Sequence, residues 1–134
     1  MTRKTTKEAE QFVKGRKSSF LAAFQGLSFV LKTQKNAWLH LLATSIVVIL
    51  SFYLQLDRME WLAILLVIGL VWMAEFLNTA FEVIVDLASP EIHPLAKIGK
   101  DVGAASVLIA AILSIIVGVI VLGPVILYKY NLFQ

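Results

Sequence analysis

Cysteine is absent from this 134-residue sequence, which excludes disulfides, thiol catalysis and cysteine-based zinc sites. Charge is also scarce: Asp, Glu, Lys and Arg make up 16% of the residues, against about 25% in an ordinary soluble domain. Hydrophobic residues make up 59%, and the mean hydropathy is +0.83. This balance excludes a disordered tail, a nucleic-acid-binding arm and most soluble enzymes, and the length predicts a single domain.

Three long apolar runs account for this composition. They cover residues 37–56, 61–81 and 102–128, and the second contains one carboxylate, Glu75, and one amide, Asn78. Each run reaches the roughly 20 residues that a helix needs to cross about 30 Å of hydrocarbon. Backbone groups in lipid must form hydrogen bonds within their own segment, so the runs predict helices. We therefore expect an all-α membrane protein with three transmembrane helices.

The residues before the first run fall into two parts. Residues 1–17 are polar and basic and are expected to form an N-terminal tail, without the compact apolar region of a cleavable signal peptide. Residues 18–33 instead carry apolar side chains at spacings of three and four, which predicts an amphipathic helix on the membrane surface. A helix packed on a protein partner is the alternative. Residues 18–134 would then form one membrane domain. The apolar positions of this helix are Phe20, Ala23, Phe24, Leu27, Val30 and Leu31.

The basic residues predict the orientation in the membrane. Eight of the twelve Lys and Arg residues lie within the first 35 positions, before the first span. Because cytoplasmic segments carry the excess of positive charge, the N-terminus should be cytoplasmic. The link at residues 57–60 is then external, and the link at residues 82–101 returns to the cytoplasm.

Four polar residues form a regular series that begins inside the second run. At positions i, i+3, i+7 and i+11 they are Glu75, Asn78, Glu82 and Asp86. Eleven residues at about 100° each return to within about 20° of the starting direction, so the four side chains share one helix face. A carboxylate withdrawn from water is a good proton acceptor, and one nearer water can bind a hard cation such as Mg²⁺. We therefore interpret Glu75 as a general base and Glu82 as a metal ligand. The alternative is a polar contact that joins helices.

Basic residues follow in the segment that leads to the third run. Lys97 and Lys100 are three residues apart, and Asp101 follows directly. A lysine that faces a carboxylate cluster suits a polyanion bridged by Mg²⁺, such as a nucleoside triphosphate. For Lys97 we favour a snorkelling anchor at the lipid headgroups, whereas for Lys100 both interpretations stay open. The small residues at 103–106 permit close approach of another helix.

Several sharper motifs are absent. No G-x-x-x-x-G-K-[ST] motif surrounds Lys100, so the segment is not a P-loop. His40 and His93 are 53 residues apart without a third ligand, which argues against a zinc site. We interpret His40 as a hydrogen-bonding or interfacial group near the start of the first span.

The polar residues also form a combined motif. It comprises E-F-L-N-T-A-F-E-V-I-V-D at residues 75–86, H-P-L-A-K at residues 93–97 and the pair Lys100-Asp101. This combination resembles the prokaryotic diacylglycerol kinase family over roughly residues 18–125. The resemblance implies ATP-dependent phosphorylation of a lipid alcohol, with Mg²⁺, at the cytoplasmic face of the bacterial inner membrane. It also implies a homotrimer whose active sites are shared between subunits.

The resemblance implies roles for individual residues as well. Glu75 matches the general base, Asn78 its neighbour in the motif, and Glu82 a metal-ligating carboxylate. Arg16 either reaches ATP or binds anionic lipid. The residues expected at the nucleotide are Asp86, Glu91, His93, Lys100, Asp101 and Arg16.

One position departs from the family pattern. Before the first span the family has a Glu, often in an E-x-N-x-x-x-H setting, that helps to hold the metal. In this sequence Asn36 and His40 match that setting, but the carboxylate is replaced by the amide of Gln34. An amide oxygen can still ligate Mg²⁺, although the site loses one negative charge. We expect weaker metal binding or a different metal arrangement, and a catalytically inactive relative is the alternative.

The family divides by substrate into a diacylglycerol branch and an undecaprenol branch. The H-P-L-A-K run and the spacing of Asn36 and His40 look more similar to the undecaprenol branch, whose substrate is a long isoprenoid alcohol. A small ion- or proton-conducting oligomer, with Glu75 as the carrier, is the rival from a different class. It leaves Glu82, Asp86 and the Lys100-Asp101 pair without a role.

Overall fold

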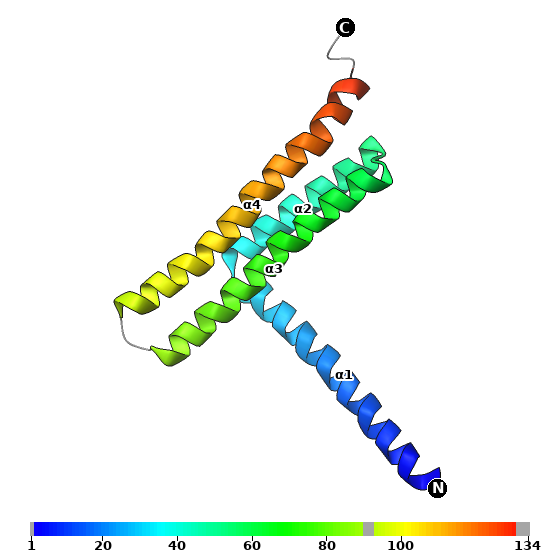
Figure 1. The fold of residues 1–134 in the computed structure, drawn as a ribbon, viewed down its shortest axis with the longest axis vertical. Coiled ribbons are helices and arrows are strands. Elements are labelled where there is room, and N and C mark those ends of the chain that lie inside the picture. Colours follow the sequence, from blue (N-terminus) through cyan, green and yellow to red (C-terminus); the bar gives the residue numbers. More distant parts are fainter. Residues whose placement is uncertain (1, 90–92, 131–134) are drawn as a thin grey trace. The chain divides into compact units, whose positions relative to one another are not determined.

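A computed structural model describes the backbone of residues 2–89 and 93–130, and the side chains of this part from residue 18 onward. Every regular element in the described residues is an α-helix (Figure 1). The chain divides into two compact units, Met1–Lys35 and Asn36–Gln134. The helices are α1 (Thr2–Thr33), α2 (Lys35–Leu54), α3 (Arg58–Ala88) and α4 (Pro94–Lys129).

Helix α1 makes up nearly all of the first unit. It is longer than the predicted surface helix because it begins at Thr2 and so includes the basic segment. Lys32 in its last turn is favourable there because the carbonyl end of a helix carries partial negative charge. Of the predicted apolar stripe, the first four positions, Phe20, Ala23, Phe24 and Leu27, are exposed as a lipid-facing stripe requires, whereas Leu31 is half-buried and Val30 is buried.

Within the described part of the chain, three helices are long and apolar enough to cross a membrane, namely α2, α3 and α4. This confirms the three predicted spans. The helices extend beyond the apolar runs: α3 continues to Ala88, and α4 begins at Pro94. The extra turns contain charged residues, Glu82 and Asp86 in α3 and Lys97, Lys100 and Asp101 in α4, as expected where a helix reaches past the hydrocarbon.

Local signals set the helix ends. Asp57 accepts hydrogen bonds from the backbone N–H groups of Met59 and Glu60, at 2.7 and 2.9 Å, and the Glu60 carboxylate accepts one from Asp57 N–H. This reciprocal capping box starts α3. At α4 the His93 imidazole caps the helix and Pro94 occupies its first turn, where proline is favoured.

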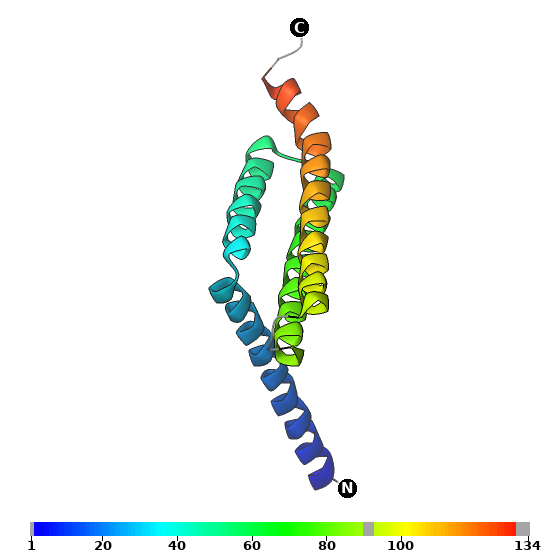
Figure 2. The same cartoon turned by 90° about the vertical axis from the view of Figure 1, so that its left-hand side faces the viewer.

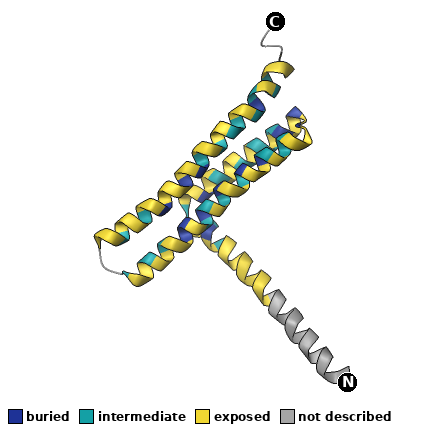
Figure 3. Ribbon diagram, viewed as in Figure 1, coloured by how far each residue is buried: buried dark blue, intermediate teal, exposed yellow. Residues whose placement is uncertain are grey.

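Helices α3 and α4 pack side by side along much of their length, and α2 lies beside them (Figures 1 and 2). Gln55 turns the chain from α2 toward α3 with a φ of 59°, a left-handed conformation common just after a helix. A small apolar core of Leu54, Leu56, Ile64 and Leu122 joins the three helices near this turn. The buried positions of α3 form a line along the helix, while most outward positions of the three helices are exposed (Figure 3).

Candidate active site

The predicted polar face of α3 runs from a buried end to an exposed end. The Glu75 residue is 1% exposed and Asn78 is also buried, whereas Glu82 is half-buried and the Asp86 side chain is 64% exposed. The arrangement agrees with the prediction of one face that leads from the bilayer interior toward water.

Asn78 connects the two halves of this face. Its amide Nδ2 donates a hydrogen bond of 3.2 Å to Glu82 Oε1, one turn further along α3. On the other side it meets α4 at Gly103, where a Cβ atom would overlap Asn78 Oδ1. The predicted close approach at the small residues is therefore confirmed at Gly103, and the absence of a side chain there leaves room for the Asn78 amide.

At the exposed end, α3 and α4 are joined by an ion pair. Lys100 Nζ lies 2.5 Å from Asp86 Oδ1, so the lysine faces the carboxylate series, as the first of its two interpretations requires. Lys97 instead pairs with Asp101 on its own helix, at 2.5 Å. Both pairs are substantially exposed, so each contributes little to stability on its own. Together they place two lysines and two carboxylates beside the same helix ends.

His40 reaches the buried end of the face from α2. Its Nε2 atom lies 3.7 Å from Glu75 Oε2, and its side chain is 17% exposed. The interpretation of His40 as a hydrogen-bonding or interfacial group did not identify Glu75 as its neighbour. The available signal was that the run at 37–56 contains no Asp, Glu, Lys or Arg and one histidine, His40.

Three buried side-chain atoms in the described residues have no hydrogen-bond partner: His40 Nε2, Glu75 Oε2 and Asn78 Oδ1. All three belong to this site. Buried polar atoms are nearly always paired, so unpaired ones call for a specific explanation. A concentration of them around one carboxylate is typical of a site built to receive a polar group.

The remaining predicted residues are placed as follows. His93 Nδ1 accepts a hydrogen bond from Leu95 N–H at 3.2 Å, which gives this residue a role in starting α4. Glu91 and the side chain of Arg16 lie outside the described residues. Gln34 follows α1 in the first unit, and its backbone N–H donates to Val30 O at 2.9 Å. Its participation in a metal site stays a prediction.

The oxygen donors of this face suit Mg²⁺. No group of three His, Asp or Glu side chains in the described residues converges as a complete metal site. Mg²⁺ typically takes one or two protein carboxylates, completed by water and substrate phosphates, so a complete protein cage is not needed. The half-buried Glu82 carboxylate, beside the Asn78 amide, fits this incomplete kind of site.

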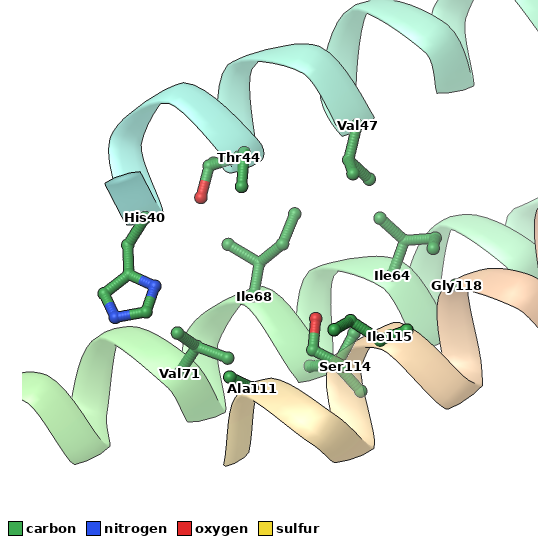
Figure 4. Close-up of a pocket in the computed structure, with 12 residues that line it drawn as sticks. His40, Thr44, Val47, Ile64, Ile68, Val71, Ala111, Ser114, Ile115 and Gly118 are labelled. Carbon is green, nitrogen blue, oxygen red and sulfur yellow. The ribbon is translucent and has the colours of Figure 1, made fainter. Parts of the chain in front are cut away.

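An apolar cavity of about 180 Å³ lies between α2, α3 and α4 (Figure 4). His40 stands at one end of it near Val71, and Val47 and Gly118 line the other end. Its polar lining residues are His40, Thr44 and Ser114. The cavity therefore links the surroundings of Glu75, through His40, to the apolar interior of the three helices.

Comparison with known proteins identifies the family and several relatives of this chain. The profile of the prokaryotic diacylglycerol kinase family matches residues 21–122. An undecaprenol kinase from Bacillus subtilis is 39% identical over 106 residues, which cover 79% of this chain and 86% of the relative. A diacylglycerol kinase from Synechocystis is 39% identical over 107 residues, 79% of this chain and 61% of the relative. A diacylglycerol kinase from Escherichia coli is 35% identical over 80 residues, 60% of this chain and 66% of the relative. The chain thus belongs to the prokaryotic diacylglycerol kinase family, a family of small membrane lipid kinases.

Proposed function

We propose that this chain transfers the terminal phosphate of ATP to the hydroxyl of undecaprenol, with diacylglycerol as the competing acceptor. The observation that carries the proposal is the buried, unpartnered carboxylate oxygen of Glu75 at the inner end of a polar helix face, in a chain of this family. The preference for undecaprenol is supported by the Bacillus undecaprenol kinase, whose alignment covers most of both chains.

In the proposed reaction the lipid hydroxyl oxygen attacks the terminal phosphorus of ATP. A new oxygen–phosphorus bond forms, the bond to the bridging oxygen of the β-phosphate breaks, and ADP leaves. Glu75 accepts the hydroxyl proton, a contribution of about 10²- to 10⁴-fold for a general base. Most of the remaining acceleration comes from positioning and from stabilising charge on the transferred group.

The exposed end of the face holds the nucleotide in this proposal. Lys100 offsets the negative charge that develops on the phosphates, and Asp86 orients the lysine through their ion pair. Glu82, with Gln34, would hold Mg²⁺, which neutralises phosphate charge when bound. The other residues that we assign to ATP are Glu91, His93, Asp101 and Arg16.

The nucleotide side of the site is cytoplasmic in this proposal. The first 35 residues and the start of α4, with Lys97 and Lys100, carry ten of the twelve basic residues, while Arg58 and Lys129 lie at the opposite helix ends. This asymmetry supports a cytoplasmic N-terminus in the bacterial inner membrane. We also propose a homotrimer, since α2, α3 and α4 expose apolar faces that lipid or neighbouring subunits can cover.

Transfer of labelled phosphate from ATP, measured in lipid–detergent micelles with each lipid in parallel, tests the proposal. We expect labelled undecaprenyl phosphate to form faster than labelled phosphatidic acid. Glu75→Gln should lower the rate by at least about 100-fold, because the amide cannot accept the proton. Glu60→Gln is the matched control, since glutamine keeps the capping box at the far end of the same helix.

The outcomes separate the alternatives. Faster transfer to diacylglycerol would reverse the substrate assignment and leave the kinase activity in place. No transfer to either lipid over a range of Mg²⁺ concentrations would overturn the catalytic proposal and favour an inactive relative.

A further inference from the structure

His40 is a partly buried titratable residue that the proposed reaction does not yet use. Its Nε2 atom is buried without a hydrogen-bond partner, and it lies 3.7 Å from a Glu75 oxygen that also has none. Two polar atoms without partners that face each other across a helix interface need only a small movement to form a hydrogen bond. The usual N–H···O distance is about 2.9 Å, so a closure of about 0.8 Å would form it.

The imidazole is held in place from both helices. It makes an edge-to-face contact with Trp72 of α3, with ring centroids 6.3 Å apart and an interplanar angle of 67°. Trp72 Nε1–H in turn donates a hydrogen bond of 3.1 Å to Thr44 Oγ1, one turn beyond His40 on α2. Trp72 also lies three residues before Glu75 on α3, so the pairs Thr44–Trp72 and His40–Glu75 are successive contacts of one interface.

This support matters because the two helices otherwise contact each other sparsely at this level. The cavity between α2, α3 and α4 begins at His40 and continues past Thr44 and Ile68 (Figure 4). A residue at the boundary between a cavity and a buried carboxylate is well placed to control which carboxylate oxygen faces the cavity. A ring fixed by packing performs that task better than a flexible side chain.

We propose that His40 is the positioning residue of Glu75. The Nε2–H group of the imidazole donates a hydrogen bond to Glu75 Oε2 and leaves Oε1 oriented toward the lipid hydroxyl. The contact is long in the free protein and shortens when the site is filled, as is common for catalytic hydrogen bonds. This inference rests on the proposed function, because it assigns His40 a task in the same transfer.

Kinetics of His40 variants test the role. His40→Phe keeps the ring but removes the donor, and we expect kcat for undecaprenol phosphorylation to fall about 100-fold with the KM for ATP unchanged. His40→Gln places an N–H donor at nearly the same distance from the backbone, so it should restore kcat to within about tenfold of wild type. Leu42→Phe, at an exposed position of α2, is the matched control and should leave kcat unchanged. An equal loss for His40→Phe and His40→Gln, or no loss for His40→Phe, would overturn the proposal.

A double-mutant cycle asks whether His40 acts through Glu75. Glu75→Asp shortens the side chain by one methylene and draws the carboxylate away from the imidazole. In that background, His40→Phe should cost no more than about threefold, because the contact is already lost. Losses that multiply fully would show that His40 acts independently of Glu75 and would overturn the positioning role.

A measurement that needs no turnover guards against variants that fail to fold. In ¹⁵N-histidine-labelled protein in micelles, the His40 ring should be in the Nε2-protonated form, and Glu75→Gln should shift the His40 signals but not those of His93. Unshifted His40 signals would overturn the contact itself. A folded wild-type chain that transfers no phosphate would instead overturn the proposed function, and the role of His40 in transfer with it.

Discussion

Replacing Gly103 by alanine should impair catalysis more than it impairs folding. An added Cβ atom would overlap Asn78 Oδ1 and lie 3.5 Å from Asn78 Cγ. The clash is with the end of a side chain, so Asn78 can rotate away while the two helix backbones stay in place. That rotation breaks the hydrogen bond from Asn78 Nδ2 to Glu82 Oε1.

Two opposing contributions to the free energy of unfolding of Gly103→Ala are similar in size. A hydrogen bond to a charged group contributes about 1.5–3 kcal/mol, and the partial exposure of Glu82 to water keeps this contact within that range rather than above it. Alanine in place of glycine within a helix stabilises the folded protein by about 1 kcal/mol. We therefore expect a net destabilisation of no more than about 2 kcal/mol.

No comparable gain offsets the effect of this substitution on the catalytic rate. Displacing a group of the site by about 1 Å can lower a rate by about 100-fold, and Asn78 lies between the proposed base and the proposed metal ligand. We expect kcat for Gly103→Ala to fall about 10- to 100-fold, with a small change in Tm, when both are measured on purified protein in the same detergent.

Gly99→Ala is the matched control on the same helix. There an added Cβ would lie 3.7 Å from Val85 Cγ2, an ordinary van der Waals contact. This variant should keep wild-type kcat and an equal or higher Tm. A Gly103→Ala protein with wild-type kcat would refute the reasoning. A large fall in Tm with kcat preserved would mean that the helices separate and Asn78 stays.

Three further variants test other parts of the structure. Lys100→Met should raise the KM for ATP at least about tenfold, whereas Lys97→Met, which loses only a pair within its own helix, should change it less than about threefold; equal effects would argue against the distinction. Gln34→Glu should lower the Mg²⁺ concentration for half-maximal transfer by restoring one negative charge, and an unchanged Mg²⁺ titration would remove Gln34 from the metal site. Gln55→Gly should raise the stability by up to about 1 kcal/mol in thermal unfolding, because glycine adopts positive φ without strain; a lower Tm would contradict this account of the turn.

The transmembrane helices and the polar face of α3 were predictable from sequence because both depend on periodicity within a single segment. An apolar run of sufficient length predicts a membrane helix whatever surrounds it, and the spacing of Glu75, Asn78, Glu82 and Asp86 fixes a shared face of one helix. The helix ends were harder to predict from the sequence. Capping by His93 places the start of α4 eight residues before the predicted apolar run, inside the predicted link at residues 82–101.

Contacts between helices could not be predicted in the same way. Which α2 residue meets Glu75 depends on the register of α2 against α3, and that register is set by the turn at Gln55 and the capping box at Asp57. Nothing in the run at 37–56 specifies that turn. The close contact of Asn78 with Gly103 is similar: small residues permit a close approach, but they do not specify which side chain fills the space.

The polar residues of α3 continue from Glu75 in one direction along the helix, and this distribution favours a kinase over a proton conductor. A conductor needs polar groups on both sides of its carrier carboxylate, so that protons can enter from one face of the membrane and leave at the other. On α3 the buried positions beyond Glu75, away from Asp86, are Val71, Val67 and Ile64, all apolar. The polar series of α3 therefore opens at one end only, and the cavity beyond Glu75 is lined mainly by apolar side chains, with three polar residues, His40, Thr44 and Ser114. A reaction that brings a nucleotide from water and a lipid from the bilayer to one carboxylate requires just such a site, which supports the proposed transfer over conduction.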